Sequence, residues 1–126
     1  MNAHHERPKV LVIDDDHDFL CDLKAWLTRE GFRTHGVEVG KAGIQHFRLY
    51  QPYGAVVLDL HMPKVNGWDV LKQIKSADSN TKVAVITGDA TAREQAFALG
   101  ADAFVVKPIG RKHICKLVNR LTGNTN

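Results

Sequence analysis

The sequence of 126 residues lacks the features that mark membrane and secreted chains. No apolar stretch approaches the roughly 20 residues that a membrane-spanning helix needs, and the start of the chain does not resemble a signal peptide. Cysteine occurs only twice, at Cys21 and Cys115, which are far apart and lack the spacing of a metal-binding pair. We therefore expect a cytoplasmic location, no contact with a membrane, and two reduced, half-buried thiols rather than a disulfide.

An excess of charge of one sign is also missing. Lysine and arginine number 17 against 14 aspartates and glutamates, which leaves a formal net charge of +3. So small an excess does not predict direct nucleic-acid binding by this domain. The chain is 44% hydrophobic and 25% charged, as in an ordinary globular protein. We expect one domain at residues 9–122, a flexible polar lead-in at 1–8 and a tail at 123–126.

Five short runs rich in β-branched residues alternate with five helical patterns. The expected strands cover residues 9–13, 33–37, 56–59, 82–87 and 103–106. The second run is short and polar, which suits an edge strand. Such alternation predicts right-handed crossovers and a parallel sheet covered by helices on both faces, which is the α/β class.

Apolar residues at helical spacing define the faces that the helices would bury. The expected second helix runs from residue 40 to 50, with Ile44, Phe47 and Leu49 as its apolar residues. The third helix would bury Val70, Leu71 and Ile74, with Lys72 and Lys75 on the outside. Basic residues of the last helix would form its solvated face: Arg111, Lys112, Lys116 and Arg120.

The run Val56–Leu58 ends on a carboxylate, Asp59. An apolar run this short indicates a strand buried on both faces, and Asp59 would then lie at its carboxyl end. Open parallel sheets place their ligand crevice at that edge. Pro63 cannot continue a strand, so the chain is expected to turn there.

Polar residues close four of the five expected strands and would meet at one edge of the sheet. They are Asp14 and Asp15, Asp59, Thr87 and Lys107. Carboxylates this close repel one another unless a cation lies among them. A cluster of oxygen ligands without histidine or cysteine side chains suits Mg²⁺. Taken singly, Asp14 or Asp15 could instead be a helix N-cap.

A metal, a lysine and a hydroxyl around one aspartate predict phosphoryl transfer. The metal and Lys107 would neutralise charge on the phosphoryl oxygens, and Thr87 would donate a hydrogen bond to one of them. Asp59 would be the nucleophile and would form an acyl phosphate.

At these residues the chain resembles the receiver domain of two-component response regulators, in the CheY-like superfamily. The resemblance extends from about Lys9 to Leu121 and rests on four motifs in the right order. These are Val12-Ile13-Asp14-Asp15-Asp16, Val57–Pro63 with Gly67, Val85-Ile86-Thr87-Gly88, and Gly100–Pro108.

The resemblance implies a (βα)₅ flavodoxin-like three-layer sandwich with strand order 2-1-3-4-5. It implies that Asp59 accepts a phosphoryl group from the phosphohistidine of a sensor histidine kinase or a phosphotransfer protein. Asp15, Asp59 and the backbone carbonyl of His61 would ligate Mg²⁺, and Asp14 would act mainly through a metal-bound water.

The same resemblance assigns Lys107 to the phosphoryl group and makes Thr87 and Phe104 the switch pair. The surface that switches would be the fourth helix, fifth strand and fifth helix, a candidate homodimer or partner face. Such a domain promotes its own phosphorylation and dephosphorylation but is not an enzyme acting on a separate substrate. An output domain, attached or separate, would read the switch.

Three positions depart from or vary within the family pattern. Asn66 stands where many relatives have aspartate, Gly88 keeps the approach to Asp59 open, and His61 is expected to be an exposed loop residue at the mouth of the site. The imidazole either tunes the lifetime of the phosphorylated state or has no effect on it.

Other function classes fit the sequence less well. An aspartate-nucleophile phosphatase usually carries a second acid two residues after the nucleophile, where this chain has His61, and a cap domain, which is missing. A receiver-like interaction domain that has lost phosphorylation would not need the intact Asp14, Asp15, Asp59, Thr87 and Lys107. A flavodoxin-type cofactor binder would need a phosphate-cradling loop after the first strand, where this chain has three aspartates.

Overall fold

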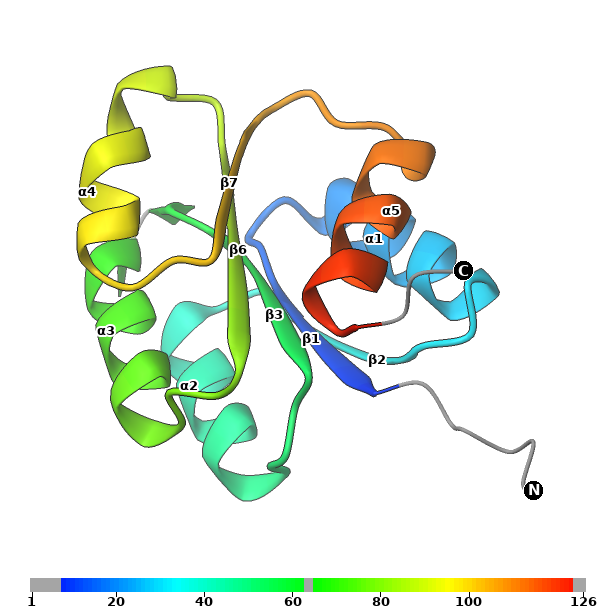
Figure 1. Ribbon diagram of the computed structural model, residues 1–126, viewed down its shortest axis with the longest axis horizontal. Helices are drawn as coiled ribbons and strands as arrows, with labels where there is room; N and C mark the ends of the chain where they lie inside the picture. Colours follow the sequence, from blue (N-terminus) through cyan, green and yellow to red (C-terminus); the bar gives the residue numbers. More distant parts are fainter. Residues whose placement is uncertain (1–7, 63–64, 124–126) are drawn as a thin grey trace.

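The computed structural model describes residues 8–62 and 65–123 and contains a five-stranded parallel sheet (Figure 1). The strands lie in the order β2-β1-β3-β6-β7, which confirms the expected order 2-1-3-4-5. Their bounds are β1 Lys9–Ile13, β2 Arg33–Val37, β3 Ala55–Asp59, β6 Lys82–Thr87 and β7 Ala103–Val106. Three expected features lie outside the described residues: the turn at Pro63, the lead-in except its last residue, and the tail except Gly123.

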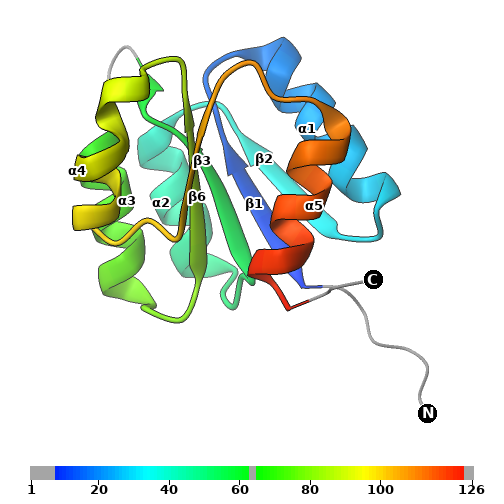
Figure 2. The same cartoon turned by 45° about the horizontal axis from the view of Figure 1, so that its top comes forward.

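Helices cover both faces of the sheet and complete the three layers (Figures 1 and 2). On one face lie α1 (His17–Arg29) and α5 (Arg111–Leu121), and on the other α2 (Gly40–Leu49), α3 (Gly67–Ala77) and α4 (Arg93–Ala98). A short 3₁₀ turn, Ala90–Ala92, precedes α4. Among the described residues, no helix has the length and apolar character needed to cross a membrane.

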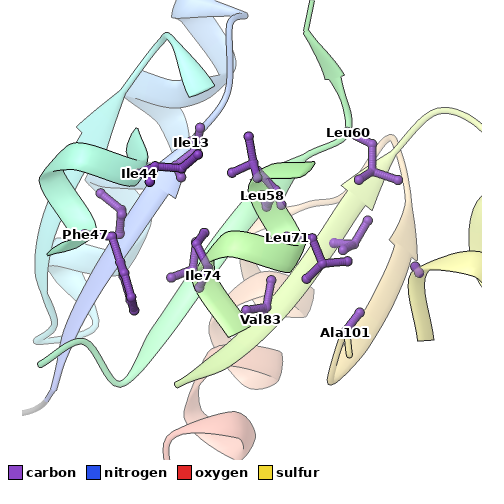
Figure 3. Close-up of a cluster of buried hydrophobic side chains, with 14 of the residues drawn as sticks. Ile13, Ile44, Phe47, Leu58, Leu60, Leu71, Ile74, Val83 and Ala101 are labelled. Carbon is purple, nitrogen blue, oxygen red and sulfur yellow. The ribbon is translucent and has the colours of Figure 1, made fainter. Parts of the chain in front are cut away.

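The two faces of the sheet bury two separate cores because successive side chains of a strand point in opposite directions. In β1, Leu11 and Ile13 pack toward α2 and α3, whereas Val10 and Val12 pack toward α1 and α5. Figure 3 shows part of the first core, in which Leu58 of β3 lies among residues from the neighbouring helices. All five residues of β3 are buried. The central strands are therefore apolar except at their ends, as both-face burial in a parallel sheet requires.

The edge strand β2 carries a cluster of histidines and tyrosines. The Nδ1 atom of His35 lies 2.7 Å from the hydroxyl of Tyr53 and 3.1 Å from Nε2 of His46. Burial and the neighbouring His46 and Lys9 lower the pKa of His35, and burial raises the pKa of Tyr53 to about 12. This polar cluster joins β2 and α2 to the segment before β3.

Short side chains cap the helices that begin beside the central strands. The Asp16 carboxylate accepts the backbone N–H of Phe19 at 3.2 Å and starts α1. The side chain of Asn66 accepts the N–H of Trp68 at 2.9 Å and starts α3. Asp16 is therefore the N-cap of α1, which leaves Asp14 and Asp15 free for another role.

Glycine is needed at the first residue of α3. A Cβ atom on Gly67 would lie 2.5 Å from the carbonyl oxygen of Leu60 and 2.6 Å from its Cα. The helix therefore begins directly against the backbone of the residue that follows Asp59. Before it, His61–Met62 (β4) and Val65–Asn66 (β5) form a two-stranded antiparallel pair where the sequence predicted only a turn.

Four residues differ from expectation in their exposure to solvent. Leu49 is 75% exposed, because it lies two residues after the buried Phe47 and so about 200° around the helix. Lys75 is not on the outside: its side chain is 17% exposed and reaches Asp102. Of the two thiols expected to be half-buried, Cys21 is exposed and Cys115 is buried, and both are free.

Candidate functional site

The register of the sheet brings the polar strand ends together at the carboxyl edge. Ile13 pairs with Leu58 and Asp59 pairs with Ile86, so Asp14 follows β1 beside Asp59, and Thr87 lies one residue further on. Thr87 pairs with Val106, and the backbone N–H of the next residue, Lys107, donates to the Thr87 carbonyl at 2.8 Å.

Three carboxylates gather at this edge. Ligand atoms of Asp14, Asp15 and Asp59 all lie within 4.8 Å of one another, the one such group of potential metal ligands among the described residues. Asp14 and Asp59 are 2% and 5% exposed, whereas Asp15 is more open to solvent. The cluster predicted from the strand ends is therefore present in the structure.

One lysine from the other end of the chain lies against two of these carboxylates. The Nζ atom of Lys107 is 3.1 Å from Asp14 Oδ2 and 3.5 Å from Asp59 Oδ2, and it lies 4.6 Å from the centre of the Phe19 ring. Burial alone would lower the pKa of Lys107, but the two carboxylates outweigh burial and raise it. The ammonium is therefore a fixed positive charge of the site.

The Asp59 carboxyl is held from both sides. Its Oδ1 accepts the backbone N–H of His61 at 3.1 Å, and its Oδ2 faces Lys107. Burial raises the pKa of Asp59 to about 6, with a further increase from Asp14 and opposing decreases from the His61 N–H and Lys107. A group with this pKa is mostly ionised at neutral pH, so Asp59 combines burial with nucleophilic capacity.

The donor set fits a hard divalent cation. Three carboxylates against one ammonium leave a local charge of about −2 when all are ionised, and every ligand atom is oxygen. The Asp14 oxygens are already engaged by the Asp16 N–H and by Lys107. The Asp15 carboxylate has no hydrogen bond or ion pair with any described residue. It is therefore the freest of the three to bind a metal ion.

The two residues of the expected switch pair, Thr87 and Phe104, lie further from the carboxylates than Lys107 does. Thr87 is fully buried, and its hydroxyl accepts the backbone N–H of Asp89 at 3.2 Å rather than contacting a carboxylate. Phe104 is partly buried and packs against the core on the α2–α3 side. A Cβ on Gly88 would meet nothing within 4 Å, so there is open space beside this residue. The side chain of His61 is exposed, as expected.

Sequence reasoning missed Phe19 as a residue of this site. Phe19 lies at helical spacing from Leu23 and packs against the core on the α1–α5 side. The same ring also lies under the Lys107 ammonium, a favourable cation–π contact. No sequence signal could have shown this second contact, because it depends on two residues that are 88 positions apart.

Comparison with known proteins decides the family. Residues 10–119, most of the chain, match the model of the response regulator receiver domain. The chain belongs to the receiver domain family.

Its relatives include regulators of transcription. The receiver domain is 33% identical over 121 residues, 93% of the chain, to the probable transcriptional regulatory protein SilR of Salmonella typhimurium. It is 31% identical over 102 residues, 79% of the chain, to the cell cycle transcriptional regulator CtrA of Caulobacter vibrioides. These matches cover 53% and 44% of the relatives, so the chain spans about half the length of the curated relatives it matches.

The solved structures agree with this membership. The response regulator TrrA of Thermotoga maritima, solved in complex with Mg²⁺-BeF, has a TM-score of 0.81 and 27% identity to this chain. The match covers 90% of this chain and 98% of TrrA. The five-stranded order and the positions of the helices are therefore those of the family.

One face of this receiver domain is hollowed and mixed in character. The hollow lies over α4, β7 and α5, and its lining includes Arg93, Phe97, Phe104, Val106, His113 and Arg120. Phe97 and Val106 are each 40% exposed. Arg111, Lys112 and Lys116 are exposed on α5, as predicted. The face thus joins the candidate switch residue Phe104 to a basic and partly apolar surface.

Proposed function

We propose that this receiver domain accepts a phosphoryl group on Asp59 from the phosphohistidine of a sensor histidine kinase or a phosphotransfer protein. The observation that carries the proposal is the buried Asp59 carboxylate, held between the His61 N–H and Lys107 beside two further carboxylates. A chain with this family's fold and an intact acidic cluster has the groups that phosphoryl transfer needs.

The chemical step exchanges one bond to phosphorus for another. A carboxylate oxygen of Asp59 bonds to phosphorus as the bond from phosphorus to the donor's imidazole nitrogen breaks, and the imidazole keeps that electron pair and takes a proton. Of the two oxygens, Oδ1 already accepts a hydrogen bond from the His61 N–H. We therefore assign the attack to Oδ2, which faces Lys107, and Lys107 stabilises charge on the transferred oxygens.

Asp15, Asp59 and the carbonyl of His61 would hold Mg²⁺, and Asp14 would contribute through a bound water. The contacts support the difference between the two aspartates, because Asp14 is occupied by Lys107 and the Asp16 N–H whereas Asp15 is open. When bound, Mg²⁺ supplies positive charge that offsets the crowded carboxylates and the phosphoryl oxygens. The complex of TrrA with Mg²⁺-BeF supports the same requirement here.

Thr87 and Phe104 would transmit the effect of phosphorylation to the face formed by α4, β7 and α5. The Thr87 hydroxyl would leave the Asp89 N–H and donate to a phosphoryl oxygen. This movement opens space beside β7, and the Phe104 ring would enter it because burial of its apolar surface is favourable. The domain promotes only its own phosphorylation and dephosphorylation, and phosphorylation shifts a population that already exists.

The altered face would bind a partner or a second copy of the chain. Relatives of about twice the length are named as transcriptional regulators, which supports an output domain, attached or separate, as the reader of this switch. We propose that the receiver domain extends over residues 9–122 and functions in the cytoplasm. An output domain, rather than this domain, would contact nucleic acid.

The test is the intact mass of the chain after incubation with a small-molecule phosphodonor and Mg²⁺. We expect one added phosphoryl group in the wild type and none in Asp59→Asn. Asp69→Asn is the matched control, since Asp69 is an exposed aspartate on α3 that forms a loose pair with Lys72 at 3.9 Å. An added group on Asp59→Asn at the wild-type rate would show that another residue is the acceptor.

A further inference from the structure

A histidine and a cysteine on the exposed side of α1 lie in contact with each other, and the histidine also contacts a glutamate that follows β2. The Nε2 atom of His17 is 3.6 Å from Sγ of Cys21, and its Nδ1 is 3.3 Å from the Glu38 carboxylate. The side chains of His17 and Glu38 are 67% and 48% exposed, and Cys21 is also exposed. None of these three residues has a role in phosphoryl transfer as proposed above.

From this arrangement we propose that His17 and Cys21 bind a thiophilic divalent cation of the zinc class, with Glu38 orienting the histidine. The two ligands are four residues apart on one helix and so lie on the same side of it. The site goes beyond the proposed function and does not depend on it.

The geometry is that of two ligands on one metal. Tetrahedral zinc with bonds of about 2.3 Å to sulfur and about 2.05 Å to nitrogen places those two ligand atoms about 3.5 Å apart. The distance between Cys21 Sγ and His17 Nε2 is 3.6 Å. Both side chains could therefore bind one ion with little movement of either.

Glu38 supplies the partner that metal-binding histidines usually have. A carboxylate on the second ring nitrogen fixes the imidazole tautomer and leaves the first nitrogen free to bind metal. Glu38 occupies this position at Nδ1 and directly follows β2. A bound ion would therefore connect the start of α1 with the end of β2.

The charges nearby favour a bound cation. Asp18 and Asp22 are exposed neighbours of Cys21 on α1, and negative groups attract a metal ion. Asp18 lies three residues before Cys21, where its carboxylate can turn to complete the site together with water. On binding, the Cys21 thiol gives its proton to solvent, and sulfur ligation separates this site from the oxygen-only cluster around Asp59.

The test uses Cd²⁺ as a probe, because thiolate binding to Cd²⁺ produces a charge-transfer band in the ultraviolet. We expect one equivalent to bind the full chain, Zn²⁺ to displace it and excess Mg²⁺ to leave it in place. Cys115→Ala and Asp59→Asn should keep the band, whereas Cys21→Ser should lose it. Glu38→Gln should weaken binding roughly 10-fold to 100-fold, and His17→Gln at least as much.

A second measurement does not depend on the spectrum. Zn²⁺ should protect Cys21, but not the buried Cys115, from alkylation as read by peptide mass. A band that persists in Cys21→Ser, or no protection of Cys21, overturns the proposal. Wild-type affinity in both His17→Gln and Glu38→Gln also overturns it, because Cys21 would then act as an isolated thiol.

Discussion

Two lysine–aspartate bridges of nearly equal length lie in different parts of this receiver domain. The Nζ atom of Lys107 is 3.1 Å from Asp14 at the carboxyl edge of the sheet. The Nζ atom of Lys75 is 3.0 Å from Asp102, between α3 and the segment before β7. The side chains of both lysines are largely buried, at 25% and 17% exposure.

The two bridges differ in what surrounds the charges. Lys75 also donates to the carbonyls of Ser79 and Thr81, and Asp102 accepts the N–H of Val83. One cation meets one anion there, and each has further hydrogen bonds. Lys107 instead meets Asp14 and Asp59, with Asp15 close by, so negative charge is in excess.

The distance between the two charges of an ion pair does not reveal the role of the pair. The Lys75–Asp102 pair is satisfied by its neighbours and ties the chain together, as a structural contact does. The cluster at Lys107 leaves crowded carboxylates whose repulsion a metal ion or a transferred group can relieve. Stability and function are thus assigned to different bridges in one small domain.

We expect the largest effects on the stability of the chain from replacing Lys75 or Lys107. Lys75→Met should lower the free energy of unfolding by about 2–3 kcal/mol, because it leaves a largely buried carboxylate and two carbonyls without their donor. Lys107→Met should also destabilise the metal-free chain, but Mg²⁺ should restore much of that loss because it can take over the cation's place. Urea unfolding with Mg²⁺ and with a chelator measures both, and an equal response of the two variants to Mg²⁺ would erase the distinction.

Replacing aspartate by asparagine should change the stability of the chain in opposite directions at Asp59 and at Asp102. Burial raises the pKa of Asp59 from 3.8 to about 6, so ionised Asp59 destabilises the fold. This cost builds up as the pH rises from about 4 to about 6 and is fully present above about 6. Without metal, Asp59→Asn should therefore stabilise the chain by about 2 kcal/mol at about pH 8 and by little at about pH 4.

Asp102→Asn should instead destabilise the chain by about 1–2 kcal/mol, because it removes the charge that faces Lys75. Thermal unfolding in the presence of a chelator compares the two substitutions. Destabilisation by Asp59→Asn above pH 6 would contradict the crowding of carboxylates inferred from the structure.

A smaller effect should come from the His35 cluster on β2, where the excess charge is positive. Because the pKa of His35 is lowered, its contribution to the stability of the fold is fully present above a pH of about 6.5. This contribution is lost as the pH falls, because protonation adds charge to a partly buried ring beside His46 and Lys9. The test is best made in chains that carry Asp59→Asn, which removes the opposing trend. We expect His35→Gln to flatten the loss of stability on acidification, and His113→Gln, an exposed histidine on α5, to leave it unchanged.

The fold was predictable to the extent that it is set by local patterns. Runs such as Lys82–Thr87 are too apolar and too short to be anything but buried strands, and the polar run at β2 correctly indicated an edge. The order of the strands came from the family resemblance, since periodicity does not determine which strands are neighbours. Periodicity also failed for Lys75, because a long side chain on the boundary of a helix can reach inward to a partner 27 residues away.

Much of the site was predictable because parallel strands bring their carboxyl ends to one edge. This rule placed Asp14, Asp15 and Asp59 together without any three-dimensional information. It could not give the rotamer of Thr87, whose hydroxyl is bonded to the Asp89 N–H, or the stacking of Lys107 on Phe19. These contacts depend on side-chain packing between distant segments, which spacing along the chain does not encode.

The missing side chain of Gly67 has a consequence for the acceptor. Because the first residue of α3 touches the backbone of Leu60, any larger residue at 67 must push that backbone aside. Leu60 is joined directly to Asp59, so the displacement would first move the carboxylate that we propose as the phosphoryl acceptor. Position 67 therefore fixes the separation between the start of α3 and the backbone of Leu60. The absence of a Cβ atom there keeps the Asp59 carboxylate in its orientation.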